Sequence, residues 1–280
     1  MTMKKLILCG MMLLTIALMA SCSSDTVDGN PDYFTSGMLS TTLDDGTAMF
    51  FLDNGDGTVS VTYDRTNPTH LNSSNAANIT TYTGVVNVPE QVTIDGKNYV
   101  VTGIDEGAFA NCQKITKVVL PATVKVLGEG AFVNCRAMTE VNIPTGVTEI
   151  PSAAFGYCNK VKTFVLPEGV TSIGVAAFAN ATAMTSITIP EGVTTIGRTA
   201  FTRCTGIKEM TLPSTVKSIG SNCFLTASKL TKLHIKATTP PTLEDSLTDN
   251  KNMVLYVPTG CKTAYEQVEL WTKFKSIEEE

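Results

Sequence analysis

A single 23-residue pattern, repeated six times in register, constrains this chain more than any other feature. The copies begin at Ile104, Leu127, Ile150, Ile173, Ile196 and Ile219. A phenylalanine follows five residues later in every copy, from Phe109 to Phe224, and a proline ends the apolar part of all but the last copy, where Lys236 stands. A fixed period of about 20–30 residues with a fixed apolar skeleton predicts a solenoid of stacked coils.

The skeleton also predicts what each coil buries. One coil cannot bury its own apolar face, so we expect the equivalent phenylalanines of neighbouring coils to stack on one another. The segment before each proline, such as Lys117 to Pro121, alternates like a short strand with one face inward, and the proline ends it because it has no amide hydrogen. Two recurrent glycines are replaced elsewhere by Pro151 and by Thr123 or Thr215, which predicts that they serve compactness rather than a left-handed turn.

The full frame reads I-G-x-x-A-F-x-x-C-x-x-[ILM]-x-x-[IV]-x-[LI]-P-x-x-[VT]-x-x-I. It resembles the BspA-type leucine-rich repeat of bacterial surface proteins, with departures at Ala181, Cys223, Ala227 and Lys236. The resemblance implies a right-handed leucine-rich-repeat stack, mainly β with short helical turns, and a surface, binding or adhesive role. It implies no catalytic residues.

The flanks of the repeat are expected to close the two ends of the stack, as a solenoid requires. We predict a signal peptide over 1–21, a flexible tether over 22–32, a β-rich N-terminal capping region over 33–103, the solenoid over 104–243 and a C-terminal cap over 244–280. Asn54 to Gly57 and Asp95-Gly96 are predicted turns of two hairpins. Val86 to Pro89 and Val254 to Pro258 copy the strand-proline element and predict one further rung at each end.

The predicted C-terminal cap contains a short amphipathic helix near 261–270, with Tyr265 and Val268 on one side. Trp271, Phe274 and Ile277 follow and are expected to cover the last coil. A core role for the single tryptophan is favoured over a role as a ligand platform.

The first residues predict export and lipid anchoring. Lys4 and Lys5 precede an apolar run, and Met19-Ala20-Ser21-Cys22 then places small residues before a cysteine. This resembles a bacterial lipoprotein signal with Cys22 as the lipidated residue; the alternative is an ordinary signal peptide with an incidental cysteine. The expected location is the bacterial outer membrane, at the cell surface or on its periplasmic face, with the membrane contacted through the N-terminal lipid only.

The net charge bears on the class of partner, and the cysteine positions bear on disulfide formation. The net charge of −5 argues against a nucleic-acid partner. An exported chain with six further cysteines could form disulfides. Four of them, Cys112, Cys135, Cys158 and Cys204, recur at one repeat position where alanine replaces cysteine twice, so we expect free, buried thiols instead.

The sequence offers no recognisable catalytic, cofactor or metal motif. His70 and His234 lie far apart, and no phosphate loop, HExxH, CxxC or nucleophile elbow occurs. A calcium loop after Asp53 is disfavoured because Gly55 and Gly57 fall where oxygen ligands are needed. We therefore predict no enzyme, no cofactor and no metal; an unrecognised carboxylate pair is the one route left to catalysis.

The outward positions of the predicted strands form the candidate binding face. They are Lys117, Val119, Glu140, Asn142, Thr163, Val165, Ser186, Thr188, Glu209, Thr211, Lys232 and His234. Small, of mixed charge and free of aromatic residues, the face fits an extended protein surface, or else is only a solvated sheet. The leading hypothesis is a non-enzymatic, lipid-anchored envelope protein that binds host matrix or another envelope protein. The alternative is a glycan-binding accessory lipoprotein in polysaccharide capture.

Overall fold

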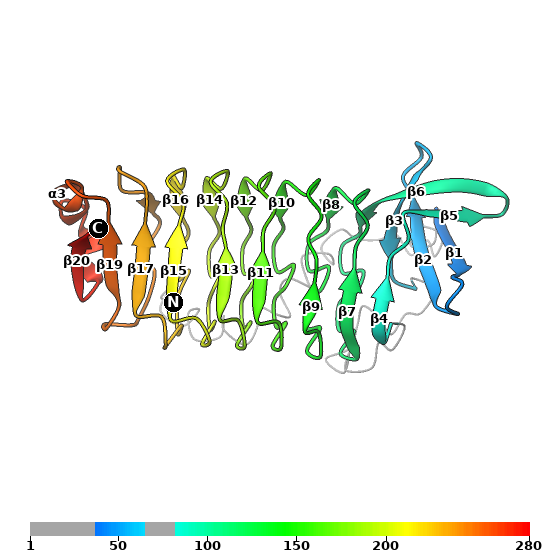
Figure 1. Cartoon of the computed structure of the whole chain (residues 1–280), viewed down its shortest axis with the longest axis horizontal. Helices are drawn as coiled ribbons and strands as arrows, with labels where there is room; N and C mark the ends of the chain where they lie inside the picture. Colours follow the sequence, from blue (N-terminus) through cyan, green and yellow to red (C-terminus); the bar gives the residue numbers. More distant parts are fainter. Residues whose placement is uncertain (1–36, 65–81) are drawn as a thin grey trace, which may run out of the picture. The chain divides into compact units, whose positions relative to one another are not determined.

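A computed structural model of the 280-residue chain describes residues 37–64 and 82–280. These residues belong to one compact unit. The predicted signal peptide, Cys22, the predicted tether and His70 lie outside the described residues. Within the unit, the repeat forms a β-solenoid whose coils follow one another from the N-terminal strands to the C-terminal cap, as Figure 1 shows. The predicted solenoid fold is therefore confirmed.

One side of the solenoid carries one strand per coil, and we call its outer surface the strand face. Its strands are β4 (Gly84–Asn87), β7 (Ile115–Val119), β9 (Glu140–Val141), β11 (Thr163–Val165), β13 (Ser186–Thr188), β15 (Glu209–Leu212), β17 (Lys232–Ile235), β19 (Val254–Val257) and β20 (Ser276–Glu279). They form three parallel sheets, β4-β7-β9, β11-β13 and β15-β17-β19-β20. Strands β4 and β19 are the two predicted extra rungs, whereas β20 was not expected.

A second side of the solenoid carries a ladder of two-residue strands. They are β8 (Val126–Leu127), β10 (Glu149–Ile150), β12 (Ser172–Ile173), β14 (Thr195–Ile196), β16 (Ser218–Ile219) and β18 (Thr242–Leu243). The last five form one parallel sheet, and β8 pairs with the N-terminal strand β6 (Lys97–Ile104). Ser218 pairs with Thr242, although the last coil is one residue longer than the 23-residue repeat. The connection before β18 accommodates the extra residue, and the pairing register is kept.

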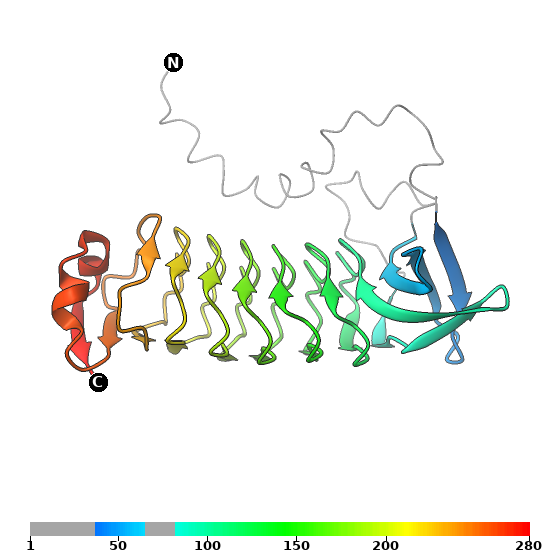
Figure 2. The same ribbon diagram turned by 90° about the horizontal axis from the view of Figure 1, so that it is seen from above.

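The third side consists of tight turns rather than the short helical turns expected from the resemblance. In the first coil, the backbone N–H groups of Gly107, Phe109 and Asn111 donate to carbonyls of the next coil at 2.9, 2.8 and 2.8 Å. Between them, turns close within the coil, as where Ala110 N donates to the Gly107 carbonyl at 2.8 Å. Figure 2 shows these coils from above, following one another with the same outline. Hydrogen bonds between coils thus alternate with hydrogen bonds within a coil, and the former connect each coil to its neighbour through the backbone.

The core of the solenoid is a column of stacked phenylalanine rings, as predicted. All six repeat phenylalanines are fully buried. The ring centroids of Phe109 and Phe132 lie 5.2 Å apart, and those of Phe201 and Phe224 lie 5.9 Å apart, with interplanar angles of 11° in both pairs. Phe164, from the strand β11, adds a further ring 5.2 Å from Phe155 and 4.8 Å from Phe178. Burial of each ring contributes roughly 1.5–3 kcal/mol relative to leaving it in water.

The recurrent glycines bring coils close together, as the sequence predicted. A Cβ added to Gly128 would lie 2.3 Å from the Glu106 backbone nitrogen, and one on Gly192 would lie 2.9 Å from the Val170 carbonyl oxygen. Neither glycine has a positive φ. The left-handed residues stand at two other positions of the coil, at Gly130 and its equivalents and at Asn134 and its equivalents.

The N-terminal cap is a sheet of β1 (Met38–Thr42), β2 (Ala48–Asp53), β3 (Thr58–Thr62), β6 (Lys97–Ile104) and β5 (Gln91–Ile94), in that order. Both predicted hairpins are present: β2 pairs with β3, and β5 pairs with β6 across Asp95 and Gly96, whose φ angles are 50° and 77°. Tyr82 covers the first ring of the column, 5.0 Å from Phe109.

The C-terminal cap contains less helix than expected. The helix α3 (Lys262–Glu266) ends early, and Val268 takes an extended conformation before the 3-10 helix η5 (Glu269–Lys273). Val268 is therefore 40% exposed, so its predicted place beside buried Tyr265 is wrong. Trp271 is fully buried and donates from Nε1 to the Pro241 carbonyl at 3.1 Å, which confirms its core role.

Candidate functional site

The structure places the predicted outward positions on the strand face. Glu140, Asn142, Thr163, Val165, Ser186, Thr188, Glu209, Thr211 and Lys232 are exposed, and Lys117, Val119 and His234 are partly covered. They reach this face because their neighbours in each strand, such as Phe164 and Leu233, point into the core. The alternation of the strands thus fixes which side chains meet solvent.

Charges on the strand face pair with each other at its two ends. The Lys117 Nζ lies 2.8 Å from Glu140 Oε1 in the coil that follows. Towards the other end, Glu209 lies 3.7 Å from Lys232 and 3.0 Å from the His234 Nε2. Exposed pairs of this kind contribute little stability, about 0–1 kcal/mol each. Their effect is to neutralise the ends of the face.

The centre of the strand face is uncharged and built of small side chains. Thr163, Val165, Ser186 and Thr188 come from the paired strands β11 and β13. The hydroxyls of Thr163 and Ser186 lie 3.2 Å apart, and the Val165 side chain is 64% exposed. A centre without charged side chains, surrounded by a polar rim, is a feature that this face shares with protein interfaces.

The C-terminal end of the strand face departs from the sequence-based expectation. The sequence predicted a face free of aromatic side chains with His234 among its outward positions, but an aromatic ring covers His234 at this end of the face. Its ring stacks on Tyr256 with centroids 4.5 Å apart, and its side chain is only 13% exposed. Tyr256 lies in β19, directly opposite His234. The strand-proline element at Val254 to Pro258 was the signal that could have revealed it.

The two nitrogens of the His234 ring face different carboxylates. Nδ1 lies 2.8 and 2.9 Å from the two carboxylate oxygens of Glu280. Nε2 lies 3.0 Å from Glu209 Oε1, yet the geometry gives it no hydrogen-bond partner among the described residues. Carboxylates on opposite sides of the ring cannot share one metal ion with it, so this cluster is a set of polar contacts rather than a chelating site.

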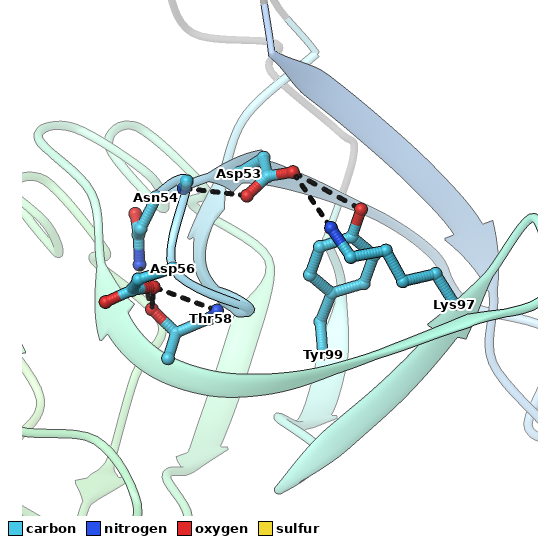
Figure 3. Close-up of polar contacts among 7 residues, drawn as sticks. Asp53, Asn54, Asp56, Thr58, Lys97 and Tyr99 are labelled. Atoms are coloured by element: carbon cyan, nitrogen blue, oxygen red, sulfur yellow. Dashed lines mark hydrogen bonds and ion pairs between the residues drawn. The ribbon is translucent and has the colours of Figure 1, made fainter.

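The carboxylates of the acidic hairpin turn between β2 and β3 accept hydrogen bonds from nearby residues of the N-terminal cap, and these bonds stabilise the turn (Figure 3). Asp53 Oδ1 accepts from the Gly55 backbone at 2.8 Å, while Oδ2 accepts from the Tyr99 hydroxyl at 3.3 Å. Asp56 accepts from the backbone and hydroxyl of Thr58 at 3.0 and 2.6 Å, and these bonds lower the pKa of its carboxyl. Among the described residues, no group of three or more His, Cys, Asp or Glu side chains is arranged to hold a metal ion.

The cysteines within residues 37–64 and 82–280 are free thiols, as predicted. Five are buried, and Cys261 is partly exposed. Cys135 Sγ donates to the Phe109 carbonyl of the preceding coil at 3.1 Å, and Cys158 and Cys204 repeat the contact at 3.3 and 3.2 Å. Burial raises the pKa of Cys112 and of Cys204 to about 12. Such thiols are protonated and inert at neutral pH.

The fold and the repeat define a leucine-rich-repeat scaffold protein. The family model of the BspA type leucine rich repeat region matches residues 87–205 and 171–279, with six copies. The matched region exceeds half of the chain, and the protein belongs to this family. No curated protein matches the chain.

Bacterial leucine-rich repeat proteins are found among the similar solved structures. The T. pallidum leucine rich repeat protein matches with a TM-score of 0.55 and 21% identity over 86% of this chain and 95% of its own. A leucine-rich repeat protein from Bacteroides ovatus matches with a TM-score of 0.49 and 22% identity over 83% of this chain and 75% of its own. At these identities the likeness concerns the fold alone.

Across the part of the chain that the structure describes, no helix is both long and apolar enough to span a bilayer.

Proposed function

We propose that this protein is a non-enzymatic, lipid-anchored protein of the bacterial cell envelope that binds another protein through its strand face. The partner is a host matrix protein or another envelope protein. The uncharged centre of the strand face, with Val165 64% exposed between paired charges, is the observation that carries the proposal. Its solvent-exposed side chains contribute nothing to the core, and membership of a repeat-scaffold family supports a binding role.

Anchoring rests on the sequence of the first residues. The apolar run ending in Met19-Ala20-Ser21-Cys22 supports lipid attachment at Cys22 and a place on the outer membrane. Protease treatment of intact cells tests the location. Cleavage of the protein on whole cells is expected; full protection would move it to the periplasmic face and exclude a role in contact with the host.

Two matched valines test the binding face. Val165 on the strand face is 64% exposed, and Val126 on the second side is 62% exposed. Protein lacking residues 1–22 is screened against host matrix proteins, envelope extracts and neutral oligosaccharides. A charge placed in the centre of an interface costs several kcal/mol when it is buried without a partner. We therefore expect Val165→Asp to abolish capture of the protein ligand and Val126→Asp to preserve it.

Two results would contradict this proposal. Equal loss of binding in both valine variants would move the binding surface away from the strand face. Micromolar binding of oligosaccharides without any protein ligand would favour the alternative of a polysaccharide-capturing lipoprotein. Melting temperatures of both variants within about 2 °C of the parent protein show that the fold is retained, as exposed substitutions normally allow.

A further inference from the structure

A second surface of the solenoid carries a cluster of positively charged side chains. It is the segment of each coil between the phenylalanine turn and the following strand, residues 111–116, 134–139, 157–162, 180–185, 203–208 and 226–231. These segments contain seven basic residues and no acidic one: Lys114, Arg136, Lys160, Lys162, Arg203, Lys208 and Lys229. We call them the basic stripe. In a chain with a net charge of −5, this separation of charge is not expected from composition.

All seven side chains of the basic stripe are exposed. None of them forms an ion pair with another residue of the described ranges, although Arg136 donates to the Asn134 side chain at 2.6 Å. The neighbouring acidic residues on the strand face are already engaged, because Glu140 pairs with Lys117 and Glu209 pairs with Lys232. The positive potential of the stripe is therefore open to a ligand.

The solenoid distributes these charges along its length, with one or two in each of five coils. The basic stripe follows the edge where strands β7 to β17 begin, so it runs parallel to the stack of coils (Figure 1). Neighbouring phenylalanine rings lie 5.2 to 5.9 Å apart, which sets the step from one coil to the next. The fourth coil, at 180–185, carries no charge and divides the stripe in two. A linear polymer with repeated negative charges matches such an array.

The surroundings of the basic stripe identify the kind of polymer. Of the exposed large hydrophobic residues, Val85, Val126, Val165, Val175 and Val268, none lies in the stripe. Protein interfaces bury an apolar centre, and peripheral membrane segments insert apolar side chains. Proteins that bind single-stranded nucleic acid stack bases on aromatic rings, and the single aromatic residue of the stripe, Tyr157, is half-buried. A hydrophilic polyanion needs none of these features.

We propose that the basic stripe binds an anionic polysaccharide, through carboxylate or sulfate groups spaced along the sugar chain. Lysine and arginine supply the charge, and the backbone hydrogen bonds between coils hold the segments that carry them in place before binding. This site is separate from the proposed protein-binding face. It gives the solenoid a second ligand of a different chemical class.

Binding of the full chain to three polysaccharides tests the proposal. The probes are heparin for sulfate, polygalacturonate for carboxylate and dextran as a neutral control. We expect binding of at least one acidic polymer and none of dextran. Affinity should fall steeply between about 50 and 500 mM salt, because exposed charges are screened over that range. The acidic polymer that binds decides between the two anionic groups.

Two triple variants locate the site. Lys160→Glu with Lys162→Glu and Lys208→Glu reverses the centre of the basic stripe. Lys125→Glu with Lys217→Glu and Lys275→Glu makes the same change in net charge at exposed lysines outside it. We expect the first triple to weaken binding by about tenfold or more and the second by less than about twofold. If the first triple fails to fold, Lys160→Gln with Lys162→Gln and Lys208→Gln takes its place.

Three outcomes would overturn the assignment. Wild-type protein could bind neither acidic polymer at low salt. The two triples could lose affinity equally, which would show a general charge effect. Anionic lipid vesicles or single-stranded DNA could bind through the stripe while both polysaccharides do not. The Val165→Asp variant, which tests the protein-binding face, should keep its polysaccharide affinity. The two proposals can therefore fail independently of each other.

Discussion

The ring of His234 lies flat against that of Tyr256, with centroids 4.5 Å apart and planes inclined by 8°. The two residues face each other on the parallel strands β17 and β19. Stacked aromatic pairs contribute about 0.5–1.5 kcal/mol beyond the burial of their area. Urea unfolding of His234→Ala, Tyr256→Ala and the double variant should therefore give a coupling energy of that size. Additive losses in the double variant would show that the stack contributes no stability of its own.

The phenylalanine column gives a stronger prediction. Phe155 is fully buried, with its ring centroid 5.3 Å from that of Phe132 and 5.6 Å from that of Phe178. Phe155→Ala should cost roughly 3–5 kcal/mol, because it removes buried area and leaves a cavity in the middle of the stack. The exposed Val165→Ala serves as the control and should change the free energy of unfolding by less than about 0.5 kcal/mol.

Hydrogen exchange distinguishes local from global damage in Phe155→Ala. Each coil of a solenoid contacts only its neighbours, so amides near Phe155 should lose protection first. A thermal melt unchanged from the parent protein would mean that the inside and the outside of the coil have been assigned the wrong way round.

The sequence predicted the solenoid because its buried positions repeat without exception. Phe109 and its equivalents stack since each coil presents the same apolar side chain at the same place, and a period is visible without any structure. Tyr256 was missed as part of the strand face, although its strand was predicted, because the face was traced through the six regular copies only. The charge pairs of the face, such as Lys117 with Glu140, could be placed side by side from the 23-residue offset.

The turn conformations could not be read from the sequence. Residues in the left-handed region include Gly107 and Gly130, and also Ala153, Ala176 and Thr199 at the equivalent positions, with φ near 54° in these last three. No common side chain marks this position, because hydrogen bonds between coils impose the conformation. Ala153 N donates to the Val175 carbonyl at 2.8 Å, and Thr199 N donates to the Ser221 carbonyl at 3.0 Å.

The buried thiols predict a loss of stability at alkaline pH. Burial raises the pKa of Cys204 to about 12, whereas an unfolded thiol has a pKa of about 8.5. Because the folded pKa is the higher one, the contribution is complete below the unfolded pKa and is lost as pH rises from about 8.5 towards 12. At pH 10 the loss should be about 1–2 kcal/mol for this thiol.

Comparison with Cys204→Ala isolates the contribution of that thiol. Alanine already occupies the equivalent site at Ala181, so the substitution is compatible with the coil. The difference in urea midpoint between the parent protein and the variant should be smaller at pH 10 than at pH 7. A constant difference between the two proteins at both pH values would mean that the thiol ionises without unfolding.

Thiol labelling tests the redox state directly. Cys261 is partly exposed, and the other five cysteines of the described part are buried. Native protein should therefore label at Cys261 first, and the five buried thiols should react after unfolding without any reductant. Labelling that requires prior reduction would show that disulfides form in the exported protein.

Thr199 should be replaceable by glycine with a gain in stability. Its φ of 54° is unfavourable for a β-branched residue, and its hydroxyl is buried without a hydrogen-bond partner among the described residues. A left-handed residue of this kind costs of order 1–3 kcal/mol, and glycine removes that cost while losing about 0.5–1 kcal/mol through the freer unfolded chain. Thr199→Gly should therefore raise the free energy of unfolding by about 1 kcal/mol in urea titrations.

Gly197, two residues earlier in the same coil, provides the opposite test. Its φ is not in the left-handed region, but an added Cβ would lie 2.6 Å from the carbonyl carbon of Gly174 and 2.6 Å from the nitrogen of Val175. Backbone atoms cannot move aside as a flexible side chain can, so Gly197→Ala should force the fourth and fifth coils apart and cost about 1–3 kcal/mol. A neutral Gly197→Ala would show that close contact between coils does not restrict this position. A destabilising Thr199→Gly would show that the left-handed conformation of Thr199 costs the folded protein no stability.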